Sequence, residues 1–156
     1  MASRLSIDTR GDQHFLEGVI DEHASLLGVI DRARNGALIL DLGGITFINS
    51  LGVREWIRMQ QAAAKIGLHM ELRRVAEPIV HQLNIVPATR GVSMVTSFFA
   101  PYECDDCDAE HDMVLDVRLH GADLAKLRAP AMPCPDCRRP MEFTSPPELY
   151  FTFLAG

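Results

Sequence analysis

In the first two thirds of the chain, segments with the apolar pattern of a strand alternate with segments whose apolar residues follow the 3.6-residue period of a helix. This pattern predicts strands and helices in alternation. Residues 5–7 and 14–20 flank the turn signal Arg10-Gly11-Asp12 and predict a β-hairpin. The apolar run 37–42 predicts a strand buried on both faces, and Gly43-Gly44 predicts a break after it. The other expected elements are strands at 68–72 and 92–98, and helices at 21–33, at 50–66 and from Glu77 to Pro87.

Helical spacing also predicts which side chains of these helices face a core. The first helix opens on acidic residues, which favour a helix N-terminus, and ends at Asn35-Gly36. The inward residues are expected to be Leu26, Leu27, Val29, Ile30 and Ala33, then Val53, Trp56, Ile57, Ala63 and Ala64, then Ile79, Val80, Leu83 and Ile85. The alternation predicts an α/β fold with helices packed on a sheet.

Residues 38–52, Leu-Ile-Leu-Asp-Leu-Gly-Gly-Ile-Thr-Phe-Ile-Asn-Ser-Leu-Gly, carry the most specific pattern in the chain. A strand and a short apolar rise end at Asn49-Ser50, two residues suited to capping a helix. This stretch resembles the core motif of STAS domains, the fold of bacterial anti-sigma-factor antagonists. Gly18-Val19-Ile20-Asp21 and residues 76–86 are similar to other parts of that family, so the resemblance covers about residues 3–98. It implies a STAS-type mixed β-sheet with helices packed on it.

The resemblance also implies a function. In STAS proteins an Asp-Ser-[Ser/Thr]-Gly turn at this place holds a serine that partner kinases phosphorylate, which makes Ser50 the candidate phosphoacceptor. A phosphate would add a charge of about −1.5 to −2 to a docking surface, at a helix N-terminus that tolerates anions. The implied partner is an anti-sigma factor, a serine-kinase-like protein or another STAS protein, contacted through Asn49, Leu51, Arg54 and Arg58. The chain departs from the motif at Asn49, which replaces Asp, and at Leu51, which replaces the second hydroxyl residue.

Other interpretations of the same stretch stay open. Asn49 or Ser50 only caps the helix, and Arg54, Arg58 and Lys65 form a solvated basic stripe. Alternatively, the surface docks a partner without phosphorylation, which the apolar Leu51 favours, or the domain is a constitutive subunit of an oligomeric STAS scaffold. All of these describe a protein that is not an enzyme. We find no phosphate-binding glycine loop, nucleophile–base signature or paired-carboxylate motif in the sequence.

Composition changes near Phe98, where a domain boundary is expected. The 156-residue chain has a net charge of −6. Residues 1–98 hold ten acidic and ten basic side chains, whereas residues 99–156 hold eleven acidic and five basic ones and all four cysteines. The expected units are therefore a STAS domain at 1–98 and a small β-rich module at 99–156.

The four cysteines form two Cys-x-x-Cys pairs separated by 26 residues. Two such pairs can surround a tetrahedral ion with four thiolates, so Cys104, Cys107, Cys134 and Cys137 predict a structural Zn²⁺ site. The module resembles a zinc ribbon, with strands expected at 114–119 and 141–143, although Asp108 and Arg138 stand where glycine is frequent. Rubredoxin-like iron, a redox dithiol pair and a zinc- or redox-responsive module are the alternatives. Disulfides are not expected in a cytoplasmic chain.

The remaining features limit the partners. An acidic module would repel phosphates, so nucleic acid is not an expected partner. No apolar run approaches the roughly 20 residues that span a bilayer, and Met1-Ala2-Ser3-Arg4-Leu5 begins no signal sequence. These features predict a cytoplasmic protein without membrane insertion. The six histidines show no ligand spacing, although His111 near the first pair could replace a cysteine ligand. Phe98, Phe99, Tyr150, Phe151 and Phe153 are expected to join the module to the first sheet or to contact a partner.

Overall fold

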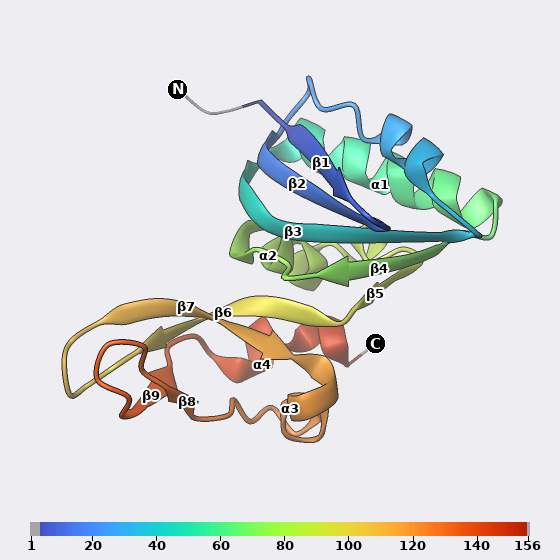
Figure 1. The fold of residues 1–156 in the computed structure, drawn as a ribbon. Coiled ribbons are helices and arrows are strands. Elements are labelled where there is room, and N and C mark those ends of the chain that lie inside the picture. Colours follow the sequence, from blue (N-terminus) through green and yellow to red (C-terminus); the bar gives the residue numbers. More distant parts are fainter. Residues whose placement is uncertain (1–3, 156) are drawn as a thin grey trace.

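The computed structural model describes residues 4–155 and places two β-sheets beside each other (Figure 1). Met1–Ser3, on which the expected absence of a signal sequence partly rests, and Gly156 lie outside the described residues. The first sheet has the strand order β1-β2-β3-β4-β5, and the second has the order β7-β6-β9-β8. The fold is mixed α/β, as predicted. The strands are β1 (Ser6–Arg10), β2 (Gln13–Ile20), β3 (Ala37–Ile48), β4 (His69–Arg73), β5 (Ser93–Val95), β6 (Ser97–Glu103), β7 (Glu110–Asp116), β8 (Met132–Pro133) and β9 (Pro140–Phe143).

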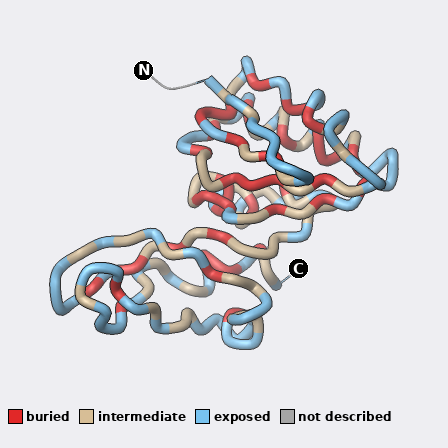
Figure 2. The backbone as a smooth tube through the Cα atoms, viewed as in Figure 1, coloured by how far each residue is buried: buried red, intermediate tan, exposed pale blue. Residues whose placement is uncertain are grey.

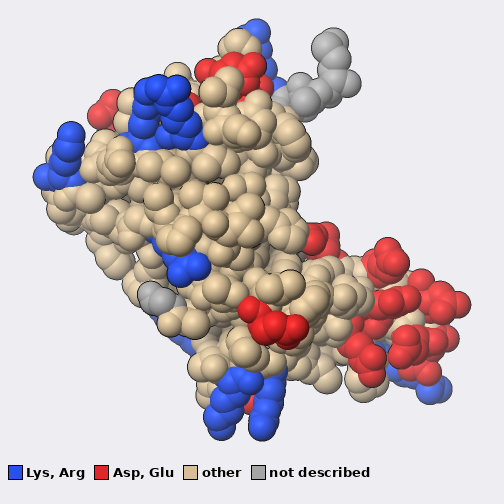
Figure 3. All heavy atoms as spheres, turned by 180° about the vertical axis from the view of Figure 1, so that it is seen from behind, with Lys and Arg blue, Asp and Glu red and all other residues tan. Residues whose placement is uncertain are grey.

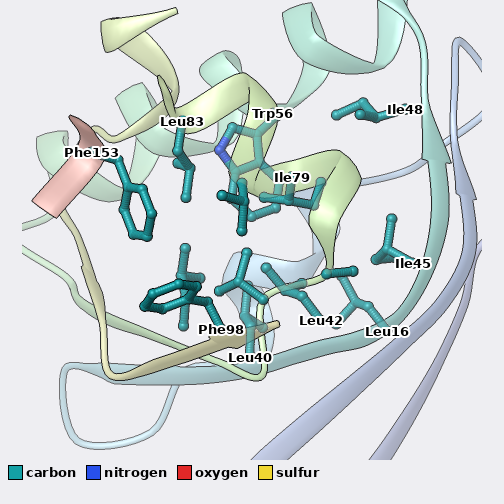
Figure 4. Packing of buried hydrophobic residues seen from close by; sticks show 14 of the residues in the cluster. Leu16, Leu40, Leu42, Ile45, Ile48, Trp56, Ile79, Leu83, Phe98 and Phe153 are labelled. Carbon is teal, nitrogen blue, oxygen red and sulfur yellow. The ribbon is translucent and has the colours of Figure 1, made fainter. Parts of the chain in front are cut away.

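The first sheet begins with the predicted hairpin, in which β1 is antiparallel to β2, and continues with parallel strands. Two helices, α1 (Ser50–Lys65) and α2 (Glu77–Ile85), pack on it. In Figure 4, Trp56 of α1 and Ile79 and Leu83 of α2 lie over Leu40 and Leu42 of β3. The burial colouring shows this core as red segments that alternate with tan and pale blue ones along the strands and helices of the first unit (Figure 2).

Four expectations about burial are wrong. Leu27, expected to face the core, is 47% exposed. Leu38, Leu40 and Leu42 are fully buried, but Ala37 and Ile39 are only half-buried, so β3 is not covered equally on its two faces. Ala64 is exposed, because Trp56, Met59, Gln60 and Ala63 already form the buried face of α1. Ile85 ends α2 with 71% of its surface exposed.

Strand β3 also runs through Gly43-Gly44 without the predicted break. A Cβ atom on Gly44 would lie 2.5 Å from the Glu17 Cγ of β2, and one on Gly43 would lie 3.0 Å from the Arg74 guanidinium. The pairing of β2 with β3 shifts register on both sides of this contact. Gly43 and Gly44 therefore let Arg74 and Glu17 approach the β3 backbone closely at a bulge. Close approach of this kind, and not only a strand break, explains glycine inside a strand.

The helix predicted at 21–33 is wrong. The segment contains only a 3₁₀ helix, η1 (Leu27–Arg32). The Asp21 side chain accepts a hydrogen bond from the His23 N–H, which makes a local turn instead of a helix start. Leu26 and Val29, three residues apart, are both fully buried, which fits the three-residue turn of a 3₁₀ helix.

The last predicted strand, 92–98, is divided between the two sheets. Strand β5 ends at Val95, and β6 begins at Ser97 and pairs with β7 and β9. The ribbon strand expected at 114–119 lies earlier in the chain, as β7 (Glu110–Asp116). It ends at Asp116, because the Asp116 side chain accepts hydrogen bonds from the N–H groups of Arg118 and Leu119 and caps α3 (Val117–Ala125). The strand expected at 141–143 is confirmed within β9.

Aromatic side chains join the two sheets. Phe98 of β6 is fully buried, and the rings of Tyr150, Phe151 and Phe153 lie 6.4, 6.0 and 5.2 Å from its ring. These three rings come from the segment that contains α4 (Pro147–Tyr150) and the 3₁₀ helix η3 (Thr152–Leu154). Asn84 of α2 hydrogen-bonds the same segment twice, at the Tyr150 carbonyl and the Phe153 N–H. The expectation that these aromatic residues join the units is confirmed for the four that are buried.

Candidate functional site

The first candidate site is the turn between β3 and α1. Asn49 is the N-cap of α1, and its side-chain oxygen accepts a 2.8 Å hydrogen bond from the Gly52 N–H. The Asn49 N–H itself bonds the Ile20 carbonyl at the end of β2. A Cβ atom on Gly52 would lie 2.0 Å from that same carbonyl oxygen, so only glycine fits here. The turn is thereby held tightly against the end of β2.

Because Asn49 caps the helix, capping does not explain Ser50. Ser50 is the first residue of α1 and is exposed. Phe47 and Leu51 are 53% and 48% exposed beside it in the sequence, and Arg54 is exposed one turn further along the helix. We call Phe47, Ser50, Leu51 and Arg54 the Ser50 face. Its exposed side chains are apolar, hydroxyl and basic.

The predicted basic stripe, made of Arg54, Arg58 and Lys65, is also exposed, but its residues differ in their ion pairing. Arg58 forms a 3.0 Å ion pair with Glu55, so part of its charge is neutralised within the helix. Asn49 donates a hydrogen bond to Glu22, and this contact is the main reason that the pKa of Glu22 lies below its usual value. An acidic group therefore stays ionised beside the cap.

Replacing Asn49 by alanine is expected to destabilise the protein by about 1 kcal/mol, because the Gly52 N–H loses its acceptor. Asn49→Ser is the matched control, since serine caps about as well as asparagine. Urea unfolding followed by the fluorescence of Trp56, the single tryptophan, measures the difference. Equal midpoints for the alanine and serine variants would show that the cap does not stabilise the fold.

The second candidate site is the cysteine cluster of the second unit. Cys104 and Cys107 follow β6, and Cys134 and Cys137 follow β8, so the sheet brings together two loops far apart in the sequence. Both loops have the same geometry. The Cys104 N–H bonds the Ala109 carbonyl and the Cys134 N–H bonds the Arg139 carbonyl, each at 2.8 Å. The residues after the second cysteines, Asp108 and Arg138, have φ angles of +57° and +66°, which explains why glycine is frequent there. We call these loops the knuckles.

The sulfur positions fit an ion with tetrahedral coordination. Cys104 Sγ lies 3.4 Å from Cys137 Sγ, and Cys107 Sγ lies 3.7 Å from Cys134 Sγ. All four sulfurs lie within 4.8 Å of one another, and all four cysteines are free. A tetrahedron with metal–sulfur bonds of about 2.3 Å has sulfurs about 3.8 Å apart. Four thiolates at these distances can hold one divalent ion.

The pKa values of the Cys134 and Cys107 thiols also favour binding of a cation. The Cys137 N–H has the largest influence on Cys134 and lowers its pKa to about 7, because it stabilises the thiolate. At Cys107 the Ala109 N–H acts in the same direction, but the neighbouring thiols and burial together raise the pKa to about 12. The thiols therefore resist ionising together. A bound cation removes this repulsion, which allows all four to act as thiolates.

His111, which follows the first knuckle in the sequence, lies beside Cys134 and Asp136 of the second knuckle. Its Nε2 atom lies 3.0 Å from an oxygen of Asp136, and both groups are within 4.8 Å of Cys134 Sγ. Carboxylates crowd this end of the molecule. Figure 3 shows them as the red cluster on the second unit. Exposed acidic residues of the region are Glu103, Asp105, Asp106, Asp108, Glu110, Asp112, Asp136 and Glu142.

Sequence reasoning missed a cavity of about 440 Å³. It is lined by Glu77 at the start of α2 and by residues of the second sheet, including Tyr102, Glu103, Glu110 and Asp112. No periodicity could have found this cavity, because its walls come from two units packed against each other. Among residues 4–155, no helix is long and apolar enough to cross a membrane.

No protein-family model matches the chain, and no match was found among curated proteins.

Proposed function

We propose that this protein is a non-enzymatic regulator that docks a protein partner through the Ser50 face, in the manner of the anti-sigma-factor antagonists that its sequence resembles. The observation that carries the proposal is the exposed Ser50 beside the half-exposed Phe47 and Leu51. Large apolar side chains in such a position lose contact with water when a partner covers them, which stabilises a complex.

Phosphorylation of Ser50 would switch this docking. The first turn of α1 contains no acidic residue, and the helix N-terminus favours negative charge. A phosphate would therefore not disrupt the domain itself. It would place about −1.5 to −2 charge within an apolar contact, which disfavours binding through repulsion and desolvation. The partner that fits is an anti-sigma factor or a serine-kinase-like protein.

We further propose that the four cysteines hold Zn²⁺ as a structural ion. A closed four-thiolate site is typical of structural zinc, and the small core of the second unit supports a need for metal. The ion would tie the two knuckles together and supply no reaction. The acidic surface around it would repel nucleic acid, so the second unit is proposed to stabilise the chain or to contact protein.

Incubation with ATP and an anti-sigma serine kinase of the source organism should label Ser50. Ser50→Ala should abolish the label, whereas Thr46→Ala, which removes another exposed hydroxyl near the turn, should keep it. Ser50→Asp should weaken binding to the same kinase at least tenfold, measured by titration calorimetry, because the carboxylate supplies part of the phosphate charge.

A label independent of Ser50 would contradict the switch. Docking without phosphorylation predicts no label but tight binding that Leu51→Asp weakens. A constitutive scaffold subunit predicts instead a stable oligomer of the protein alone, visible by light scattering and dissociated by Leu51→Asp.

A further inference from the structure

All four sulfurs of the cysteine cluster lie within 4.8 Å of one another, and two of the close contacts cross between the knuckles. Cys107 contacts Cys134 at 3.7 Å, and Cys104 contacts Cys137 at 3.4 Å. A disulfide needs a sulfur–sulfur distance of about 2.05 Å, so each pair must close by roughly 1.5 Å. Side-chain rotation can supply much of this movement once no ion holds the sulfurs apart.

The four thiols differ in their exposure. Cys107 is exposed and Cys137 is half-buried, whereas Cys104 and Cys134 are buried. A small oxidant in solution therefore reaches Cys107 first, because Cys107 is the exposed thiol of the cluster and access controls which sulfur a peroxide meets. The thiol that lies 3.7 Å from Cys107 belongs to the other knuckle and is shielded from direct attack.

We propose that the cysteine centre is a site of reversible oxidation, at which a peroxide converts the four thiolates into the disulfides Cys107–Cys134 and Cys104–Cys137 and releases the metal ion. In the first step, the Cys107 thiolate attacks the peroxide, forms a sulfenic acid and releases hydroxide. The Cys134 thiolate then attacks the sulfenic sulfur, forms the disulfide and releases a second hydroxide. With two of its four ligands gone, the ion leaves. A second peroxide oxidises Cys104 and Cys137 by the same two steps.

The crossing pattern has a structural consequence. The ion ties the loop after β6 to the loop after β8, and crossed disulfides tie the same two loops by covalent bonds. Disulfides within each knuckle would leave those loops unconnected. Crossed pairing therefore predicts that the oxidised, metal-free protein keeps its second sheet, whereas the reduced, metal-free protein loses it. A thiol reductant and the metal would restore the starting state.

The inference rests on metal binding by the four cysteines and not on docking through Ser50, so the two can fail separately. The metal-loaded protein is treated with hydrogen peroxide while a chromophoric chelator reports released metal. The products are then digested without reduction, and mass spectrometry identifies the linked peptides. We expect metal release, followed by peptides linked through Cys107–Cys134 and Cys104–Cys137, and recovery of metal binding after reduction.

Two variants with equal numbers of remaining ligands test the role of exposure. Cys107→Ser is expected to release metal to peroxide several-fold more slowly than Cys137→Ser, because it lacks the exposed thiol. If neither variant binds metal, the disulfide pairs found in the oxidised wild-type protein alone decide whether the proposal stands. Links within each knuckle, irreversible sulfinic or sulfonic products, metal retention in peroxide, or equal release rates in the two variants would overturn the proposal.

Discussion

Removing metal from the reduced protein is expected to unfold the second sheet. Structural zinc contributes an apparent 10–16 kcal/mol, roughly, in small metal-dependent peptides, and that binding energy is folding energy. Over residues 104–143, the fully buried apolar side chains other than the cysteines are Leu115, Leu124 and Met141. This core cannot replace the ion. Acid is expected to act in the same direction, because protonated thiols do not bind metal.

A chelator with a thiol reductant is added to the purified protein, and two-dimensional NMR follows the amide signals of both units. Signals from residues 104–143 should collapse to the narrow range of an unfolded chain. Cys104→Ser should reproduce this result, whereas Asp105→Asn, which changes a neighbouring residue of the same knuckle, should bind about one ion per chain. A spectrum that chelation leaves unchanged would show that the second sheet does not depend on metal.

Truncation of Phe98 is expected to produce the second largest effect. This side chain is fully buried, and its ring lies 5.2–6.4 Å from the rings of Tyr150, Phe151 and Phe153. Figure 4 shows Phe98 beside Leu40 of the first sheet, with Phe153 on its other side. Phe→Ala substitutions in such cores cost about 3–5 kcal/mol, and whole domains are stable by only about 5–15 kcal/mol. Phe98→Ala should therefore weaken both the first core and the attachment of the C-terminal segment.

The neighbouring Phe99→Ala supplies the control. Phe99 is half-buried and lies under the Arg74 guanidinium, so its removal should cost less. Trp56 fluorescence reports unfolding of the first unit, and the charge-transfer absorption of a Co²⁺-substituted cysteine centre reports the second. In the wild-type protein both signals should change together, and in Phe98→Ala they should separate. Equal losses for the two variants would contradict the role assigned to Phe98.

Local patterns were sufficient for several elements. The hairpin at Arg10-Gly11-Asp12, helix α1 with its stop at Gly67, and α2 opening at Glu77-Pro78 all follow from turn and cap chemistry within a few residues. The close grouping of the four cysteines is also as expected, because each Cys-x-x-Cys pair is a local signal that repeats. The repeated Cys-x-x-Cys spacing is a more specific signal than apolar periodicity, because few structures other than metal sites need thiols at this spacing.

Other features depend on contacts that no local pattern contains. The segment at 21–33 has helical spacing, yet the turn made by the Asp21 side chain replaces a helix start, and the segment contains only a 3₁₀ helix. Gly43 and Gly44 look like a break in sequence, and only the close approach of Glu17 and Arg74 shows why they lie inside a strand. Residues 92–98 predict one strand, but Thr96 separates two sheets. Its N–H bonds the Leu72 carbonyl, and its carbonyl accepts the Val117 N–H.

The sequence by itself determined the α/β class, the turn at Asn49-Ser50 and the set of four cysteines, because each rests on short-range chemistry. Only the tertiary structure decided which residue caps α1, which thiols are exposed and which lie across from one another. It also decided that Phe98 and the C-terminal aromatic residues share one core. These properties depend on how distant segments pack, and packing is set by the burial of surfaces that meet only after the chain has folded.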